Sequence, residues 1–238
     1  MKILIVGASQ GLGKALVEGL AGDDDTIIGI SRNRPKDLQL QTKAKVDWIS
    51  VDMSNPIQAS DTIEEQAPTE LDVIIYNLGI WEEAAFSNSY HFLQSSDEEI
   101  VNLINTNVTS AIILMKRLVP RLLKSRRPQV ILTGSTSGLP QSGAAEVAFG
   151  ASKFALRGIA DALREGFRKE KLAVTCLQIG DLNTEDSLSV PVDMACQRGS
   201  GTLIPLHDVV DITRTLINFS SSSFVKEITL PAILDARF

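Results

Sequence analysis

Three glycines near the start of the chain have the spacing of a site that binds an anion. Gly7, Gly11 and Gly13 lie between an apolar run at residues 3–6 and an amphipathic stretch that ends near Leu20. Gly7 permits a tight turn, Gly11 lets the backbone approach a bound group, and Gly13 lets a helix pack closely on a strand. Three glycines in seven residues also occur in ordinary turns. The flanking strand and helix patterns favour a diphosphate site, because free N–H groups at a helix start attract anions.

The rest of the chain alternates between short apolar runs and helical stretches. The runs at 26–30, 46–51, 71–76, 129–133, 173–178 and 224–230 predict further strands. Helical spacing covers 55–66, with Ser54 as N-cap, then about 97–124 and a stretch from about 148. Continuous apolar runs suit parallel strands that helices cover on both faces. We therefore expect one domain over residues 1–238, with a doubly wound, mostly parallel, seven-stranded α/β sheet.

Composition and charge exclude several classes of protein. The chain has 238 residues, a net charge of −6 and no basic cluster, which argues against nucleic-acid binding. Its opening apolar run is far shorter than the roughly 20 residues that span a bilayer, so we expect a cytoplasmic protein without a membrane segment. Cys176 and Cys196 have neither metal-ligand spacing nor the pattern of a disulfide framework, so no metal site is predicted.

The glycine spacing G-x-x-x-G-x-G resembles that of the short-chain dehydrogenase/reductase family. Further along, Asn77-Leu78-Gly79 resembles the end of the family's Asn-Asn-Ala-Gly motif, and Ile179-Gly180 followed by Thr184 resembles its Pro-Gly-x-x-x-Thr motif. The resemblance covers essentially the whole chain. It implies a Rossmann-like fold that binds a nicotinamide cofactor at the carboxyl ends of the strands.

Arg32 follows the second predicted strand, where a Rossmann-type site meets the adenosine ribose. A carboxylate there would hold the 2′-hydroxyl of NAD, whereas Arg32 can pair with a 2′-phosphate, so we expect NADP(H) to be preferred over NAD(H). The alternative is a solvated loop arginine beside Arg34 and Lys36. Asp52 resembles the family's adenine-contacting aspartate or, alternatively, caps the next helix. The cofactor contacts that the resemblance implies are Gly7, Ser9, Gln10, Gly11, Leu12, Gly13, Ser31, Arg32, Asp52, Met53, Asn77, Gly79, Lys153, Ile179, Gly180, Leu182 and Thr184.

The catalytic residues that the resemblance implies are Asn107, Ser135, Phe149 and Lys153. Lys153 matches the lysine of the family's Tyr-x-x-x-Lys motif, which holds the cofactor ribose and lowers the pKa of the tyrosine. Asn107 resembles the asparagine that holds a water in the family's proton relay. Ser135 matches the family serine when counted back from Gly138, but Thr136 lies 13 residues before position 149, which is the commoner spacing. Both hydroxyls therefore remain candidates.

Phe149 stands where the family has its catalytic tyrosine, which exchanges a proton with the substrate oxygen. Phenylalanine has no proton to give, and a positioned acid is worth ~10²- to 10⁴-fold in rate. We therefore expect hydride transfer to or from a carbonyl or alcohol substrate to be impaired unless Ser135, Thr136, water, Tyr90 or His91 supplies the proton. The alternative function is a non-catalytic NADP(H)-binding sensor.

Two further segments bear on substrate access and assembly. Residues 181–204 contain Pro, Ser and Gly without periodicity, which predicts a mobile lid over the substrate. The helix predicted at 97–124 is apolar on more than one face, so either the fold or a second subunit covers it. Relatives in the family commonly pair through this helix and the next one. We therefore expect a homodimer or homotetramer, and Pro120 is expected to kink or shorten the helix.

Overall fold

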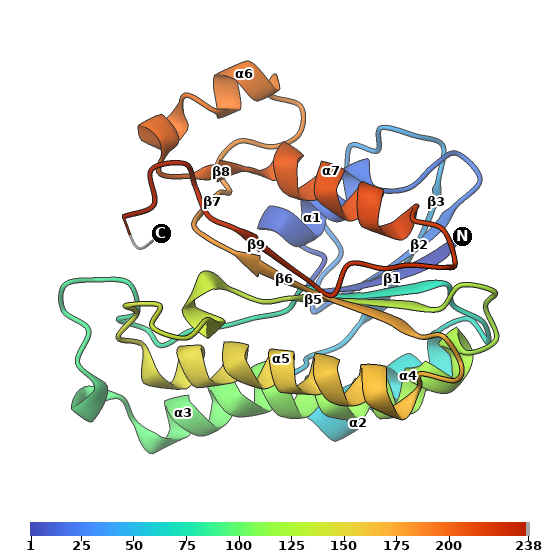
Figure 1. Cartoon of the computed structure of the whole chain (residues 1–238), viewed down its shortest axis with the longest axis horizontal. Coiled ribbons are helices and arrows are strands. Elements are labelled where there is room, and N and C mark those ends of the chain that lie inside the picture. Colours follow the sequence, from blue (N-terminus) through green and yellow to red (C-terminus); the bar gives the residue numbers. More distant parts are fainter. Residues whose placement is uncertain (237–238) are drawn as a thin grey trace.

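The computed structural model describes residues 1–236 and contains one large parallel sheet (Figure 1). Its strands follow the order β3-β2-β1-β4-β5-β6-β9, and all neighbours run parallel. The order reverses between β1 and β4, which is where such sheets form a ligand crevice at their carboxyl edge. The predicted Rossmann-like, seven-stranded sheet is therefore confirmed. The strands are β1 (Lys2–Val6), β2 (Thr26–Ser31), β3 (Lys45–Ser50), β4 (Val73–Tyr76), β5 (Gln129–Thr133), β6 (Ala173–Ile179) and β9 (Glu227–Leu230).

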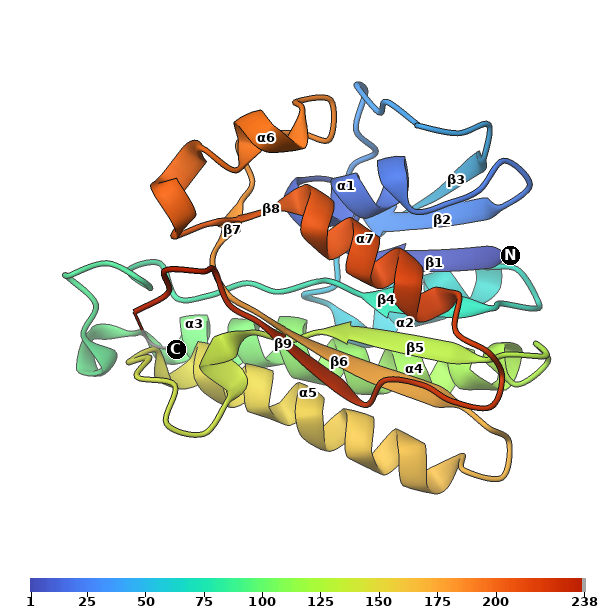
Figure 2. The ribbon, with the colours of Figure 1, turned by 45° about the horizontal axis from the view of Figure 1, so that its top comes forward.

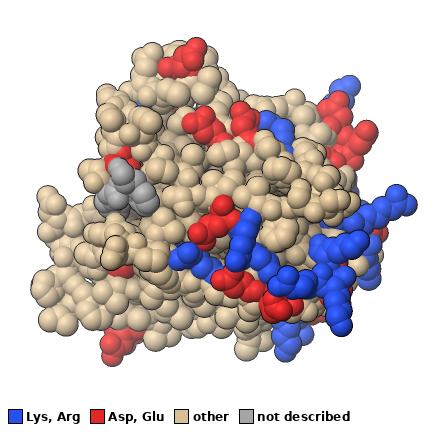
Figure 3. Space-filling model, viewed as in Figure 1, with Lys and Arg blue, Asp and Glu red and all other residues tan. Residues whose placement is uncertain are grey.

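Helices cover both faces of this sheet (Figures 1 and 2). They are α1 (Gly11–Gly19), α2 (Pro56–Gln66), α3 (Asp97–Ile104), α4 (Ser110–Leu122), α5 (Val147–Gly166), α6 (Val192–Ala195) and α7 (Leu206–Ile217). Helices α1 and α7 lie against one face, and α2, α4 and α5 lie against the other. A two-stranded pair, β7 (Leu182–Asn183) and β8 (Ile204–Pro205), leads into and out of the segment that carries α6. On the face drawn in Figure 3, most Lys and Arg gather toward the end where the strands begin.

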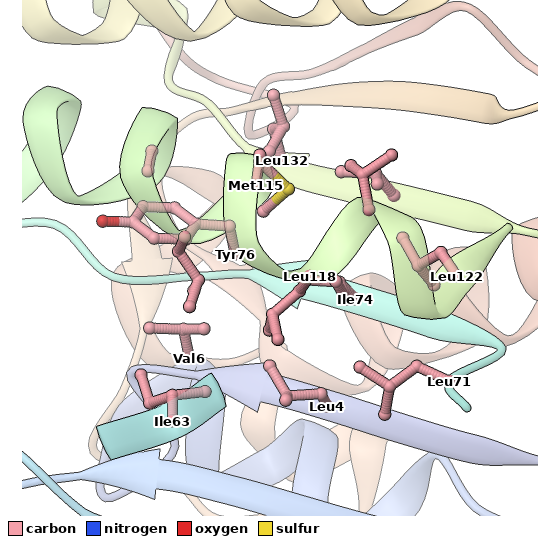
Figure 4. Packing of buried hydrophobic residues seen from close by; sticks show 14 of the residues in the cluster. Leu4, Val6, Ile63, Leu71, Ile74, Tyr76, Met115, Leu118, Leu122 and Leu132 are labelled. Carbon is pink, nitrogen blue, oxygen red and sulfur yellow. The ribbon is translucent and has the colours of Figure 1, made fainter. Parts of the chain in front are cut away.

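Alternate residues of the central strands point to opposite faces of the sheet. In β1, Leu4 and Val6 belong to the buried cluster shared with α2, α4 and α5, whereas Ile3 and Ile5 belong to the cluster shared with α1 and α7. Figure 4 shows Leu4 and Val6 in one layer with Ile63 of α2. Because helices cover both faces of the sheet, β1 needs apolar side chains on both of its sides. This is why its sequence is a continuous apolar run and does not alternate between apolar and polar residues.

The long helix predicted over residues 97–124 is divided. One π-helical turn, Asn105–Thr109, joins α3 to α4, and its extra residue changes which side chains face the sheet. Helix α4 continues past Pro120 and ends at Leu122. Pro120 is exposed, so water can bond the carbonyl that its missing N–H leaves unpaired.

Two other details predicted from the sequence were wrong. Helix α2 begins at Pro56 with Asn55, not Ser54, as N-cap, because proline's fixed φ suits the first helical turn. Strand β9 begins at Glu227 rather than at 224, where Phe224 is exposed and outside the ladder. The segment 181–204 contains β7, α6 and β8, and its role as a lid over the substrate stays a prediction.

Most of the apolar surface of α3 and α4 is covered within the chain. Leu103, Leu114 and Leu118 are fully buried, whereas Val101 and Ile112 are 58% and 50% exposed. Packing inside the chain therefore buries most apolar side chains of these helices. Val101 and Ile112 are the two that remain exposed. None of the helices in residues 1–236 combines the length and the apolar composition needed to cross a bilayer.

Candidate active site

One cavity of about 930 Å³ opens at the carboxyl edge of the sheet. Residues at or just beyond the ends of β1, β2, β3, β4, β5 and β6 line it, because parallel strands finish at the same edge. Of the predicted site residues, Gly13 and Asn107 do not line the cavity but contact residues that do. The others all line it: Gly7, Ser9, Gln10, Gly11, Leu12, Ser31, Arg32, Asp52, Met53, Asn77, Gly79, Ser135, Phe149, Lys153, Ile179, Gly180, Leu182 and Thr184.

The glycine turn places the start of α1 against the cavity. Gly7 and Gly11 have φ angles of 79° and 50°, in the region that side chains disfavour. A Cβ on Gly13 would lie 1.8 Å from the carbonyl oxygen of Gly7, so only glycine allows α1 to approach β1 this closely. Gln10 provides no side-chain cap for α1. The N–H groups of the first turn are therefore left for an anion.

Arg32 is exposed at the end of β2 and lines the cavity. It forms none of the ion pairs found within residues 1–236, whereas Asp37 of the same loop is held by Lys14 at 2.6 Å. The hydrogen bond from Lys14 keeps the pKa of Asp37 below its ordinary value, so that carboxylate is charged but neutralised by its partner. Asp52 lines the cavity and also accepts the Ser54 N–H at 3.0 Å, so it orders the turn before α2.

Lys153 is the buried cation of the site. It is 6% exposed, and its Nζ donates to the carbonyl oxygen of Thr133 at 3.1 Å. Burial lowers the pKa of Lys153 to about 8. Its Nζ lies 5.4 Å from the centroid of the Phe149 ring, one helical turn earlier. A Cβ on Gly79 would come within 3.0 Å of the same Nζ, so the glycine leaves room for the ammonium group.

Ser135 and Thr136 both line the cavity where β5 ends. The Ser135 N–H donates to Gln178 Oε1 at 3.1 Å, and Ser135 Oγ accepts the Ser137 N–H at 3.1 Å. Gln178 is fully buried, so this turn is anchored from the neighbouring strand β6. Sequence reasoning missed Gln178, since nothing in an apolar strand pattern marks which polar residue faces a neighbouring turn. Both hydroxyls remain candidates for the family's serine.

Asn107 lies in the π-helical turn and is 1% exposed. Its Oδ1 accepts the Ile80 N–H at 2.8 Å, and its Nδ2 donates to the Ile80 carbonyl at 2.7 Å and to Ser152 Oγ at 3.0 Å. The side chain therefore joins the segment after β4 to α5. Its predicted role in holding a water stays a prediction.

Neither tyrosine of the chain lies in the cavity. Tyr76 is buried, and its hydroxyl donates to the Thr106 carbonyl at 2.9 Å; burial raises its pKa above the ordinary value. Tyr90 accepts the Val147 N–H at 2.9 Å and lines, with His91, a separate cavity of about 420 Å³. The Tyr90 hydroxyl is therefore bonded to the backbone at the start of α5, and both Tyr90 and His91 line the separate cavity rather than the main one.

Trp81 and Phe86 are site residues that sequence reasoning missed. Both line the main cavity and contact Phe149, with ring centroids 6.4 Å and 5.3 Å from it. They come from the aperiodic stretch between β4 and α3, where no pattern distinguishes a buried aromatic residue from an exposed one. Across residues 1–236, no group of His, Cys, Asp and Glu has an arrangement that could hold a metal ion.

The comparison with protein families agrees with this geometry. The family model described as short chain dehydrogenase matches residues 1–191. The chain belongs to the short-chain dehydrogenase family. A relative within this family is the NADPH-dependent pterin aldehyde reductase of Arabidopsis thaliana, which is 31% identical over 190 residues, covering 77% of this chain and 75% of the relative.

Solved structures of short-chain dehydrogenases share the fold. A metagenomic short-chain oxidoreductase in complex with NADP has a TM-score of 0.72 at 18% identity, and covers 98% of this chain and 97% of its own. The alcohol dehydrogenase of the archaeon Thermococcus sibiricus, complexed with 5-hydroxy-NADP, has a TM-score of 0.75 at 18% identity. The match covers 98% of this chain and 96% of the dehydrogenase chain. At this identity the likeness establishes the fold alone.

Proposed function

We propose that this short-chain dehydrogenase binds NADP(H) in the main cavity and transfers a hydride between the nicotinamide and a carbonyl or alcohol substrate. The observation that carries the proposal is the buried Lys153, which shares one cavity with an uncapped helix start. The residues present fit a dinucleotide, because Gly13 lets the start of α1 approach β1 closely and Gly79 leaves room for the Lys153 ammonium group at the cavity. The name of the Arabidopsis relative, an NADPH-dependent reductase, supports the same cofactor class.

Each part of the cavity has a proposed partner on the cofactor. The first turn of α1 would hold the diphosphate, Arg32 the 2′-phosphate and Lys153 the nicotinamide ribose. The bound cofactor would supply or accept the hydride. Asp52 with Met53 would contact the adenine, and the stretch after β6 would contact the nicotinamide. The other cavity residues in these roles are Ser9, Gln10, Leu12, Ser31, Asn77, Ile179, Gly180, Leu182 and Thr184.

We propose that proton transfer is the weak step of this enzyme. Phe149 places a ring without a hydroxyl beside Lys153. Ser135 and Thr136, the two candidates for the family's serine, are the cavity hydroxyls that would donate a proton, directly or through water. Serine and threonine hydroxyls are far weaker acids than a phenol, so the catalysed rate should be impaired.

A non-catalytic NADP(H) sensor is the second candidate function. The observation that favours it is Phe149 itself, which lines the cavity but whose ring has no proton to donate. The retained set of Lys153, Asn107 and Ser135 favours the enzyme, because a protein that only binds the cofactor would not need all three.

Replacing Arg32 with alanine is expected to weaken NADPH binding about 10- to 150-fold and to leave NADH binding unchanged. The variant loses a hydrogen-bonded charge pair, worth ~1.5–3 kcal/mol. Calorimetric titration of both cofactors measures the effect. Arg34→Ala is the matched control, because Arg34 is exposed in the same loop but does not line the cavity. Equal NADPH affinity of Arg32→Ala and the unchanged chain would remove Arg32 from the cofactor site.

We also propose that the chain forms a homodimer or homotetramer through the α3–α4 and α5 helices. Val101 and Ile112 are half exposed there, and Phe154 of α5 is 42% exposed. Ile112→Glu is expected to shift the assembly toward the 25.8 kDa monomer in sedimentation velocity, since a carboxylate is costly in an apolar interface. Ile57→Glu on α2 makes the same change at a 64% exposed isoleucine and should leave the assembly intact. A monomeric unchanged chain at micromolar concentration contradicts the proposal.

A further inference from the structure

The cavity end that holds Phe149 carries an aromatic wall, formed by Trp81, Phe86 and Phe149. We propose that this wall binds the ring of a flat, uncharged aromatic carbonyl compound, which is the substrate class of the enzyme. The inference rests on the proposed function, because the carbonyl must meet a bound nicotinamide.

The three rings of the aromatic wall touch one another edge to face. Ring centroids lie 6.0 Å apart for Trp81 and Phe86, 6.4 Å for Trp81 and Phe149, and 5.3 Å for Phe86 and Phe149. Phe149 is 6% exposed, whereas Trp81 and Phe86 are 56% and 52% exposed although they line the cavity. Large aromatic surface is thus left open beside the candidate catalytic residues. Such surface gains most from another ring, which can stack or meet it edge to face.

The aromatic wall is held in place before any ligand binds. Phe86 has a φ of 63°, which is unfavourable for a residue with a side chain. Its N–H donates to Glu146 Oε1 at 2.9 Å, and Glu146 is 8% exposed. On the other side, Glu82 is 1% exposed, and its Oε1 accepts the N–H groups of Ala148 and Phe149 at 2.9 Å and 3.2 Å. Two buried carboxylates therefore dock the loop of Trp81 and Phe86 onto the start of α5.

Backbone strain of this kind persists only when surrounding contacts impose it, and it gathers at binding sites. Here the imposed conformation presents Phe86 to the cavity rather than burying it. A rigid ring ligand loses little internal freedom on such a preformed surface, whereas an alkyl chain must give up its rotamers. The aromatic wall is therefore expected to bind a ring ligand more tightly than an alkyl ligand of similar apolar area.

The charges around the cavity exclude an anionic substrate group at the aromatic wall. Among the described residues that line the cavity, the cations are Arg32 and Lys153. Arg32 belongs to the end of β2, and Lys153 is buried against the Thr133 carbonyl. On the face drawn in Figure 3, few Lys or Arg lie at the carboxyl edge of the sheet. Lys153 lies beside Phe149, but a carboxylate or phosphate placed at Trp81 and Phe86 would meet no cation of the cavity lining.

The test compares two methyl ketones of equal carbon number, acetophenone and 2-octanone, by calorimetric titration into the full chain saturated with NADP⁺. Acetophenone is expected to bind about 2- to 13-fold more tightly, the gain typical of one aromatic pair. 4-Acetylbenzoate, which adds a carboxylate to the same ring, is expected to bind more weakly than acetophenone. Equal affinities of acetophenone and 2-octanone would overturn the substrate class.

Two variants locate the effect on the aromatic wall. Phe86→Leu and Trp81→Leu are each expected to lose most of the preference for acetophenone. Phe92→Leu is the matched control, because Phe92 is 43% exposed in the same loop but does not line the cavity. If both wall variants still bind acetophenone more tightly than 2-octanone to the same degree, the proposal is overturned.

A second readout does not depend on turnover or on folding of those variants. The chain has two tryptophans, so Trp48→Phe leaves Trp81 as the only tryptophan, whose emission can be excited apart from that of tyrosine. Acetophenone is expected to change its emission saturably, and no saturable change would contradict the proposal. Titration of NADP⁺ alone tests the cofactor separately, and the ketone titrations repeated without cofactor test the aromatic wall even if NADP⁺ does not bind.

Discussion

Replacing Phe149 with tyrosine is expected to raise the rate of NADPH-dependent carbonyl reduction by roughly 10²-fold or more, equivalent to about 2.7 kcal/mol of barrier. The ring of Phe149 already lies 5.4 Å from Lys153 Nζ, so the variant adds one hydroxyl without a backbone change. Burial lowers the pKa of Lys153 to about 8. Below that pH the ammonium group favours the phenolate and brings the pKa of the new phenol toward the working pH. The gain should shrink as the pH rises above about 8, because Lys153 then loses its charge.

The measurement is NADPH oxidation by both forms with small aldehydes, alkyl ketones and aryl ketones, on both sides of pH 8. NADPH affinity should barely move, since the ring already occupies the position. Phe154→Tyr on the same helix is the control, because Phe154 does not line the cavity and its new hydroxyl should have no effect. Tight NADPH binding without turnover in either form would favour the sensor. Rapid NADPH oxidation by the protein that keeps Phe149 would indicate another proton donor. Tyr90→Phe and His91→Ala would then test the two candidates.

Replacing Gly13 with alanine is expected to weaken NADP(H) binding by about tenfold or more, because displacing the first turn of α1 would break at least one N–H bond to the diphosphate, worth ~1.5–3 kcal/mol. The new Cβ would lie 1.8 Å from the Gly7 carbonyl oxygen, a backbone atom that cannot move without reshaping the glycine turn. Alanine is favoured over glycine in a helix by ~1 kcal/mol, whereas overpacking costs ~1–3 kcal/mol. The clash therefore outweighs the propensity, and the free energy of unfolding should fall.

Gly158→Ala is the matched control for this prediction. Gly158 also lies inside a helix, α5, but a Cβ there would meet nothing within 4 Å. This variant should raise the free energy of unfolding by ~0.5–1 kcal/mol and leave NADP(H) affinity unchanged. Urea unfolding and calorimetric titration measure both variants. A Gly13→Ala protein with normal stability and affinity would contradict the role assigned to the close approach of α1 and β1.

The fold and the position of the cavity followed from local sequence patterns. Continuous apolar runs alternating with helical stretches require covered parallel strands, and parallel strands finish at one edge of their sheet. Residues as distant as Gly7, Asn77 and Lys153 therefore converge there whatever the details of their contacts. The glycine turn was predictable for the same reason, since its backbone angles and close packing depend on residues within one strand, turn and helix.

The tertiary structure alone decided which side chains meet at the chemical end of the cavity. The sequence could not place Trp81 and Phe86 on Phe149, because their loop has no periodicity and buried carboxylates dock it on a helix some 60 residues later. It could not place Tyr90 and His91 in a separate cavity, since that depends on how their loop packs on the start of α5. Local patterns determine backbone geometry through short-range sterics and burial, whereas contacts between distant loops depend on the packed positions of both partners.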